Sequence, residues 1–196
     1  MHRLSASFVL GYHGCDATVA EKLLAGERFL PSSNDYDWLG PGVYFWEANP
    51  QRGLDFAIEA SRRASSIRQP AVVGAVIELG LCLDMTTRKA LEMVREAYVT
   101  LKASFDTAGR PLPRNSADFL RRNLDCAVVQ RLHSILDDAG ERLDTVRGVF
   151  IEGSPIYPNS GFNEKTHTQI AVRNLACIKG VFRVPENQLQ RWTPAA

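Results

Sequence analysis

The chain alternates between short runs of β-branched and aromatic residues and segments whose apolar residues recur at helical spacing. The apolar runs predict strands at Ala6–His13, Val43–Trp46, Ala71–Leu79, Gly148–Glu152, Thr168–Arg173 and Ile178–Val184. The strand from Ala71 is expected to end near Asp84. Apolar residues about 3.6 positions apart predict helices over 17–24, 50–67, 87–101 and 116–138, with a Pro-rich loop at 109–115.

Two helix starts carry specific capping signals. Asp16 precedes the first helical segment, and an Asp side chain in that position can accept a hydrogen bond from a free backbone N–H of the first turn. Asn49 precedes Pro50, so the second helix is expected to begin with Asn as its N-cap and Pro at its first position.

The order of elements places strands near both ends of the chain, with most of the helical pattern between them. This order predicts an α+β domain in which N- and C-terminal strands pair. We expect a single domain over 1–196 that contains a helical insertion at about 85–147. No G-x-G-x-x-G follows a predicted strand, which disfavours a Rossmann-type dinucleotide site.

Charge, cysteine spacing and the lack of long apolar stretches argue against several classes of protein. The 23 Lys and Arg against 22 Asp and Glu give a net charge of +1, which implies no long-range attraction to nucleic acid or to an anionic membrane. The four cysteines lack C-x-x-C spacing, so we expect buried free thiols, no metal site and no disulfide framework. The first ten residues make a poor secretory signal, and no apolar stretch approaches membrane-spanning length. We therefore expect a cytoplasmic protein.

The segment from Asp35 to Glu47 concentrates aromatic and acidic side chains around Gly40-Pro41-Gly42. Gly and Pro predict a loop there, followed by a short aromatic strand. Alternation in that strand would turn Tyr44 and Trp46 to one side and leave a face for a ligand. A buried core strand after an ordinary turn is the alternative.

Three motifs in this order resemble a known enzyme family. Tyr12-His13-Gly14, then Gly40-Pro41-Gly42-Val43-Tyr44-Phe45, then the strand Thr168-Gln169-Ile170-Ala171-Val172, are similar to the catalytic core of the ADP-ribosyltransferases. The likeness is to the branch of the poly(ADP-ribose) polymerases and their bacterial mono-ADP-ribosylating relatives. It covers residues 8–60, 71–84 and 148–184 and leaves the helical insertion outside.

The resemblance implies that NAD is the co-substrate, with a role for each motif. His13 would hydrogen-bond the adenosine ribose, Gly14 would hold the nicotinamide amide through its backbone, and Tyr44 would stack on the nicotinamide ring. Phe56 would offer a second stacking face. Tyr36 and Phe45 complete the residues expected to contact NAD.

The third motif departs from the family, which usually has Glu where this chain has Gln169. A glutamine amide can bond the ribose 2′-hydroxyl, but it carries no charge to stabilise an oxocarbenium-like transition state. Glu164 is the first candidate for the missing acid, ahead of three others: Glu152, Asp35 and Asp37. The departure puts polymer elongation in doubt.

Four side chains outside these motifs have expected positions of their own. His133 lies on an apolar helical pattern and is expected in a core or against a partner. His167 would share a strand face with Gln169 if the strand extends that far, so a substrate-side position and an ordinary structural position are both open to it. Arg121 and Arg122 form a basic pair of the kind found on solvated helix faces or against nucleic-acid phosphates.

The resemblance therefore implies a mono-ADP-ribosyltransferase that acts on a protein or nucleic-acid acceptor, with protein slightly favoured. Bacterial relatives of this size suggest an intracellular toxin or defence effector, which would have an antitoxin or immunity protein as partner and no membrane association. A catalytically silent module that binds NAD or ADP-ribose and an NAD glycohydrolase are the alternatives.

Overall fold

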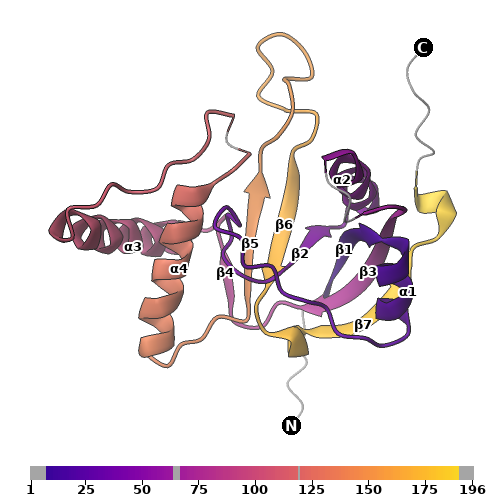
Figure 1. Ribbon diagram of the computed structural model, residues 1–196, viewed down its shortest axis with the longest axis horizontal. Helices are drawn as coiled ribbons and strands as arrows, with labels where there is room; N and C mark the ends of the chain where they lie inside the picture. Colours follow the sequence, from indigo (N-terminus) through magenta and orange to yellow (C-terminus); the bar gives the residue numbers. More distant parts are fainter. Residues whose placement is uncertain (1–7, 64–66, 119, 190–196) are drawn as a thin grey trace. The chain divides into compact units, whose positions relative to one another are not determined.

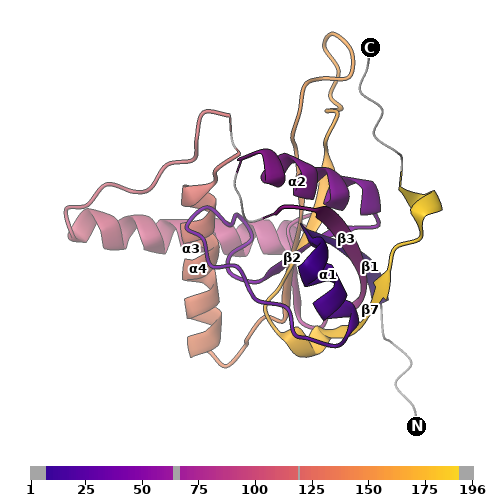
Figure 2. The ribbon, with the colours of Figure 1, turned by 45° about the vertical axis from the view of Figure 1, so that its right-hand side comes forward.

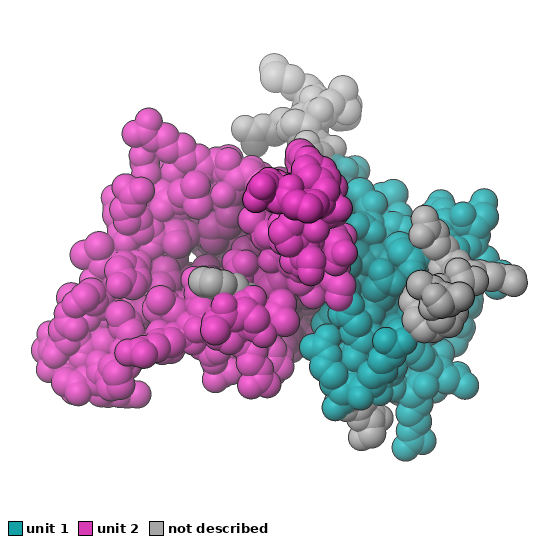
Figure 3. Space-filling model, turned by 90° about the horizontal axis from the view of Figure 1, so that it is seen from above, with its two compact units in different colours: residues 1–29, 45–78, 178–196 teal, residues 30–44, 79–177 magenta. Residues whose placement is uncertain are grey.

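The computed structural model describes residues 8–63, 67–118 and 120–189. Within these residues the chain forms seven β-strands, four α-helices and two short 3-10 helices (Figure 1). This mixed content confirms the expected α+β class. The chain divides into two compact units, coloured separately in Figure 3, and each is described by itself below. Unit 1 comprises Met1–Phe29, Phe45–Glu78 and Ile178–Ala196, and unit 2 comprises Leu30–Tyr44 and Leu79–Cys177.

Unit 1 is built on antiparallel strands in the order β2-β1-β3-β7. Their bounds are Phe8–Asp16 for β1, Val43–Glu47 for β2, Pro70–Glu78 for β3 and Ile178–Arg183 for β7. The first two residues of β2 belong to unit 2. The pairing of β3 with β7 confirms that strands from the two ends of the chain lie side by side. The expected strand residues Ala6 and Ser7 lie outside the described part of the chain.

Both helices of unit 1 begin where the capping signals predicted. Helix α1 (Ala17–Leu24) follows Asp16, whose Oδ1 accepts a hydrogen bond from the backbone N–H of Thr18 at 2.9 Å. Helix α2 (Pro50–Arg63) follows Asn49, whose Oδ1 accepts from the N–H of Arg52 at 3.0 Å. The helices pack on β1 and β3 (Figure 2). The expected extension of α2 falls partly on residues 64–66, outside the described residues.

Unit 2 contains a mixed set of strands and the two longer helices. Strand β4 (Cys82–Asp84) runs parallel to β5 (Thr145–Phe150), and β5 pairs antiparallel with β6 (His167–Val172). Helices α3 (Arg88–Thr107) and α4 (Asn123–Asp138) pack against each other. They share one core with the strands, formed by Leu39, Leu83, Ala90, Ala97, Leu101, Val128, Leu132, Leu136, Leu143, Val146 and Ala171. The expected helical insertion is therefore part of a strand-containing unit, and β5 begins within its last expected residues.

The strand expected to run from Ala71 towards Asp84 is in fact two strands. Strand β3 ends at Glu78, and the chain turns at Gly80, whose φ of +58° favours glycine. The Asp144 carboxylate stabilises this turn by accepting a hydrogen bond from the Leu81 N–H at 2.9 Å. A side chain distant in sequence therefore fixes a break that the apolar pattern does not show.

Helix α4 begins at Asn123, seven residues later than the pattern over 116–138 predicted. The backbone of Ser116 pairs with Arg121 at 2.8 Å, which closes a turn ahead of the helix. Asn115 then caps the helix from outside, because its Oδ1 accepts from the N–H groups of Leu124 and Asp125 at 2.9 and 3.3 Å. Because apolar residues keep helical spacing through this turn, the sequence pattern predicted a helix that starts too early.

Candidate functional site

The loop before the aromatic strand is held closed by its own polar groups. Ser32 and Gly42 exchange two backbone hydrogen bonds of 2.8 and 3.0 Å. Between them the Asp37 carboxylate accepts from the Ser32 hydroxyl at 2.7 Å and from the Asn34 N–H at 2.8 Å. Asp37 therefore serves the loop as its internal acceptor, and Asp35 lies exposed.

The glycines of Gly40-Pro41-Gly42 are required by close contacts. Gly40 has a φ of +79°, and a Cβ built there would lie 2.7 Å from Cε1 of His133 on α4. A Cβ on Gly42 would lie 2.9 Å from the carbonyl oxygen of Val172 on β6. The motif thus lets the loop approach both a helix and a strand of unit 2.

The hydroxyl of Tyr44 is engaged by the loop. The hydroxyl accepts from the N–H of Leu39 at 3.0 Å and donates to the carbonyl of Gly40 at 2.9 Å. Burial raises the pKa of Tyr44 well above its usual value, and the negative charge of Asp37 raises it further. The phenol therefore stays neutral at physiological pH and cannot act as a base.

The prediction that the aromatic strand has one open face is wrong. Val43, Phe45 and Trp46 are exposed by only 1%, 0% and 3%. Tyr44 is partly buried against the core of unit 2. The alternative interpretation, a buried strand, describes these residues better.

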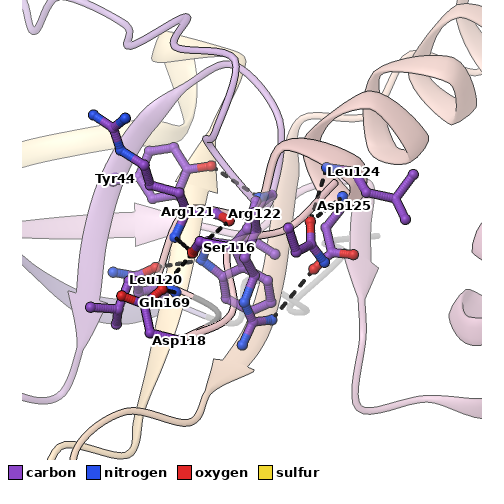
Figure 4. A network of polar contacts seen from close by, with 12 residues as sticks. Tyr44, Ser116, Asp118, Leu120, Arg121, Arg122, Leu124, Asp125 and Gln169 are labelled. Atoms are coloured by element: carbon purple, nitrogen blue, oxygen red, sulfur yellow. Dashed lines mark hydrogen bonds and ion pairs between the residues drawn. The ribbon is translucent and has the colours of Figure 1, made fainter. Parts of the chain in front are cut away.

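Gln169 is bound to the loop that precedes Tyr44. The indole Nε1 of Trp38 lies 2.6 Å from Oε1 of Gln169, in the same unit (Figure 4). Because an indole N–H can only donate, the acceptor must be the amide oxygen, and this fixes the orientation of the side-chain amide. Gln169 is thereby left with its Nε2 donor group for any further partner. Tyr44 and Gln169 are thus both hydrogen-bonded to the loop over 38–40.

Arg122, which the sequence placed in a basic pair, contacts two aromatic rings of unit 2. Its guanidinium lies 4.9 Å from the centre of the Trp38 ring and 4.4 Å from that of Phe150, and 3.7 Å from the Asp125 carboxylate. Burial lowers the pKa of Arg122. The residue is not on a solvated helix face as expected. The apolar spacing predicted that Arg122 lies inside a helix, whereas it lies one residue before the start of α4.

Glu164 lies in the long connection between β5 and β6 (Figure 1), where it closes a turn. Its backbone N–H donates to the carbonyl of Ser154 at 3.0 Å, and its carboxylate accepts from the Ser154 N–H at 3.4 Å. The backbone carbonyl of Glu152 accepts from Lys165 in the same connection. The structure therefore joins Glu164 to the loop and not to Gln169.

Tyr36 and His167 each contact neighbours within unit 2. The Tyr36 ring is 37% exposed and lies 5.1 Å from the guanidinium of Arg121. His167 is buried, stacks on Phe150 at 5.5 Å and bonds the carbonyl of Lys165 through Nδ1 at 2.6 Å. This arrangement favours the structural alternative for His167 over the substrate-side one.

In unit 1, His13 lies within an aromatic cluster. Its ring is 5.3 Å from Phe29 and 5.7 Å from Phe45. Alternation along β1 directs Gly14 to the other face, where a Cβ would lie 2.0 Å from the carbonyl oxygen of Gly53 on α2. The glycine after His13 therefore admits the backbone of a helix.

Phe45 and Phe56 lie on opposite faces of the unit 1 sheet. Phe45 is on the His13 side, whereas Phe56 packs on Trp46 at 4.8 Å, on the side covered by α2. The expected NAD contacts within unit 1 are thus divided between two faces.

His133 and three of the four cysteines are buried, as expected. His133 is buried in unit 2, and burial together with the charge of Arg173 lowers its pKa to about 4. Cys15, Cys126 and Cys177 are buried free thiols, and Cys82 is partly buried. Burial and the neighbouring Asp16 raise the pKa of Cys15 to about 11.

Two further features concern metals and membranes. In the described part of the chain, no group of three or more His, Cys, Asp or Glu side chains could hold a metal ion. Among the helices of residues 8–63, 67–118 and 120–189, none combines the length and apolar character needed to cross a bilayer.

Comparison with known proteins gave one short similarity. No family model and no solved structure matches the chain. The uncharacterized protein MJ0359 of Methanocaldococcus jannaschii is 50% identical over 36 residues, which is 18% of this chain and 17% of that protein. The matched segment thus spans less than a fifth of either chain.

Proposed function

We propose that the protein is a mono-ADP-ribosyltransferase, which cleaves NAD and transfers ADP-ribose to a protein or nucleic-acid acceptor. The observation that carries the proposal is that Tyr44 and Gln169, from separate motifs, are hydrogen-bonded to the same loop of unit 2. By resemblance to the family, these residues would act at the nicotinamide riboside. His13 of unit 1 would hold the adenosine ribose.

The geometry in unit 2 suits orientation of the substrate better than acid–base chemistry. Because the hydroxyl of Tyr44 is engaged by the loop, any stacking on nicotinamide would use the part of its ring that is not packed on the core, and such a contact is worth about 0.5–1.5 kcal/mol beyond burial. Gln169 would donate through Nε2 to the ribose 2′-hydroxyl while its oxygen keeps the bond from Trp38. Neither group removes a proton, so departure of nicotinamide would depend on the stabilisation of positive charge by other groups.

The neutral glutamine gives specific support to a second candidate. A module that binds NAD or ADP-ribose without cleaving it needs hydrogen bonds and stacking, and it needs no carboxylate. An Oε1 already satisfied by Trp38 fits that role. An NAD glycohydrolase, with water as acceptor, would share the NAD site of the transferase.

The experiment is incubation of the purified protein with cell lysate and NAD labelled in its adenylate, followed by protease or nuclease. Label in protein or in nucleic acid supports transfer and gives the acceptor class, whereas free ADP-ribose alone supports hydrolysis. NAD that stays intact although calorimetry detects its binding supports the silent module. Intact NAD without measurable binding contradicts the proposal in all three forms.

Variants connect the activity to the residues. Tyr44→Ala and His13→Ala should each weaken NAD binding or turnover by tenfold or more, roughly the loss expected for one aromatic or hydrogen-bonded contact. Tyr157→Ala, an aromatic truncation at a 54% exposed loop position, is the matched control. Folded Tyr44 and His13 variants with full activity would refute the assignment. Gln169→Glu would raise NAD cleavage if the missing charge limits the reaction.

A further inference from the structure

A cavity of about 710 Å³ lies within unit 2 and is bordered by α3, α4 and β5. Its walls are mainly apolar and include Trp38, Leu91, Val94, Tyr98, Val128 and Val149. Small-molecule sites are typically apolar clefts of about 300–1,000 Å³ with a few polar groups that fix orientation. None of the residues assigned above to NAD lines this cavity, so it is a separate feature of the unit.

The charged groups of the cavity wall are two guanidiniums and one carboxylate. Arg122 lies 3.7 Å from the Asp125 carboxylate and over the Trp38 ring. Arg95 is exposed on α3, and it makes no hydrogen bond or ion pair to any described residue. The wall therefore has an excess of positive charge next to apolar surface, with the Arg95 guanidinium available to a ligand.

We propose that this cavity binds a small organic carboxylate, with its apolar body against the helices and Trp38 and its head group on Arg95. Charge complementarity favours one negative charge, because one of the two guanidiniums is already paired. A carboxylate also matches the planar fork of a guanidinium, which can donate two parallel hydrogen bonds to it. The inference does not rest on the NAD proposal, because binding is measured without NAD.

The test compares three probes with the same eight-carbon chain. Octanoate, octan-1-ol and octyltrimethylammonium carry negative, neutral and positive heads, and calorimetry at low ionic strength gives the affinity of each. Octanoate should bind about tenfold more tightly than either of the others, the gain expected for one charge-assisted hydrogen-bonded pair. Equal or tighter binding of the ammonium probe, or no binding of octanoate, overturns the proposal.

Paired variants in unit 2 locate the site. Arg95→Gln should weaken octanoate about tenfold, whereas Arg88→Gln, whose side chain is 90% exposed on the same helix and does not line the cavity, should leave it unchanged. Leu91→Glu places a carboxylate at the cavity wall and should weaken octanoate by a similar factor. Leu30→Glu, at an 89% exposed position of unit 2 that does not line the cavity, is its control.

Unchanged octanoate affinity in both folded cavity variants would contradict the proposal. Competition with NAD provides a second check that the two sites are separate. As NAD is increased, the octanoate dissociation constant of the parent protein should level off at a finite value, because NAD at a separate site can shift octanoate binding but cannot exclude it. Displacement of octanoate by NAD would overturn the assignment of the cavity to a separate carboxylate ligand.

Discussion

The two units hold their motif residues by different physical means. In unit 1, His13 is packed between Phe29 and Phe45, and Gly14 is fixed by the backbone of α2. In unit 2, Gln169 and Tyr44 are fixed by hydrogen bonds of 2.6–3.0 Å to one loop. The first arrangement depends on shape and the second on matched donors and acceptors. The comparison predicts that the His13-Gly14 motif of unit 1 is sensitive mainly to added volume, whereas unit 2 is also sensitive to lost polar partners and to pH.

The largest effect is expected from Gly14→Ala. The new Cβ would lie 2.0 Å from the Gly53 carbonyl oxygen, so α2 would have to move away from β1. We expect a loss of at least about 3 kcal/mol in the free energy of unfolding, measured by urea denaturation. Gly180→Ala is the matched control, because a Cβ there meets no atom within 4 Å. Equal stability of the two variants would remove the packing explanation for unit 1.

The next effect is a pH dependence from His133. In the unfolded chain this histidine takes up a proton below its ordinary pKa of 6.5, whereas in the folded protein it stays neutral down to about pH 4. The unfolded state therefore binds more protons as the pH falls, and stability decreases between pH 6.5 and 4. From pH 6.5 to 5 we expect the parent to lose about 2 kcal/mol more than His133→Leu. Parallel pH profiles of unfolding would contradict this sign and this residue.

The smallest effect is the coupling between Trp38 and Gln169. A double-mutant cycle with Trp38→Phe and Gln169→Leu should give an interaction free energy of about 1 kcal/mol, typical of one hydrogen bond. Phenylalanine keeps an aromatic ring under Arg122, so the cycle isolates the N–H donor. A cycle of Trp38→Phe with Gln188→Leu, at an exposed position in unit 1, should give no coupling. Equal interaction free energies in both cycles would contradict a specific hydrogen bond between Trp38 and Gln169.

Local signals predicted much of the secondary structure. Asp16 and Asn49 marked helix starts because capping depends on groups within three residues of each other. The break after Glu78 and the late start of α4 depend on Asp144 and Asn115, side chains distant in sequence from the groups that they bond. An apolar pattern contains no information on such partners.

In the candidate site, too, the sequence predicted local motifs but not the contacts between residues distant in sequence. The motifs identified Tyr44 and Gln169 as residues to consider, and their hydrogen-bond partners came only from the fold. The sequence did not predict the contacts of Arg122 with Trp38 and Phe150, because they join residues far apart along the chain. The burial of both faces around Phe45 and Trp46 was hidden for a related reason, since alternation states which residues share a face and not what covers it.

Trp38 contacts Gln169 through its N–H and the cavity through its ring, so it can link binding at the two places. Its N–H holds Gln169, while its ring forms part of the wall of the 710 Å³ cavity. A carboxylate that displaces the ring would also alter the amide that Trp38 orients. Thermodynamic reciprocity then requires that any ligand bound at Gln169 change the affinity of the cavity by the same factor. The indole of Trp38 would thus couple the binding of a ligand at Gln169 to the binding of a carboxylate in the cavity.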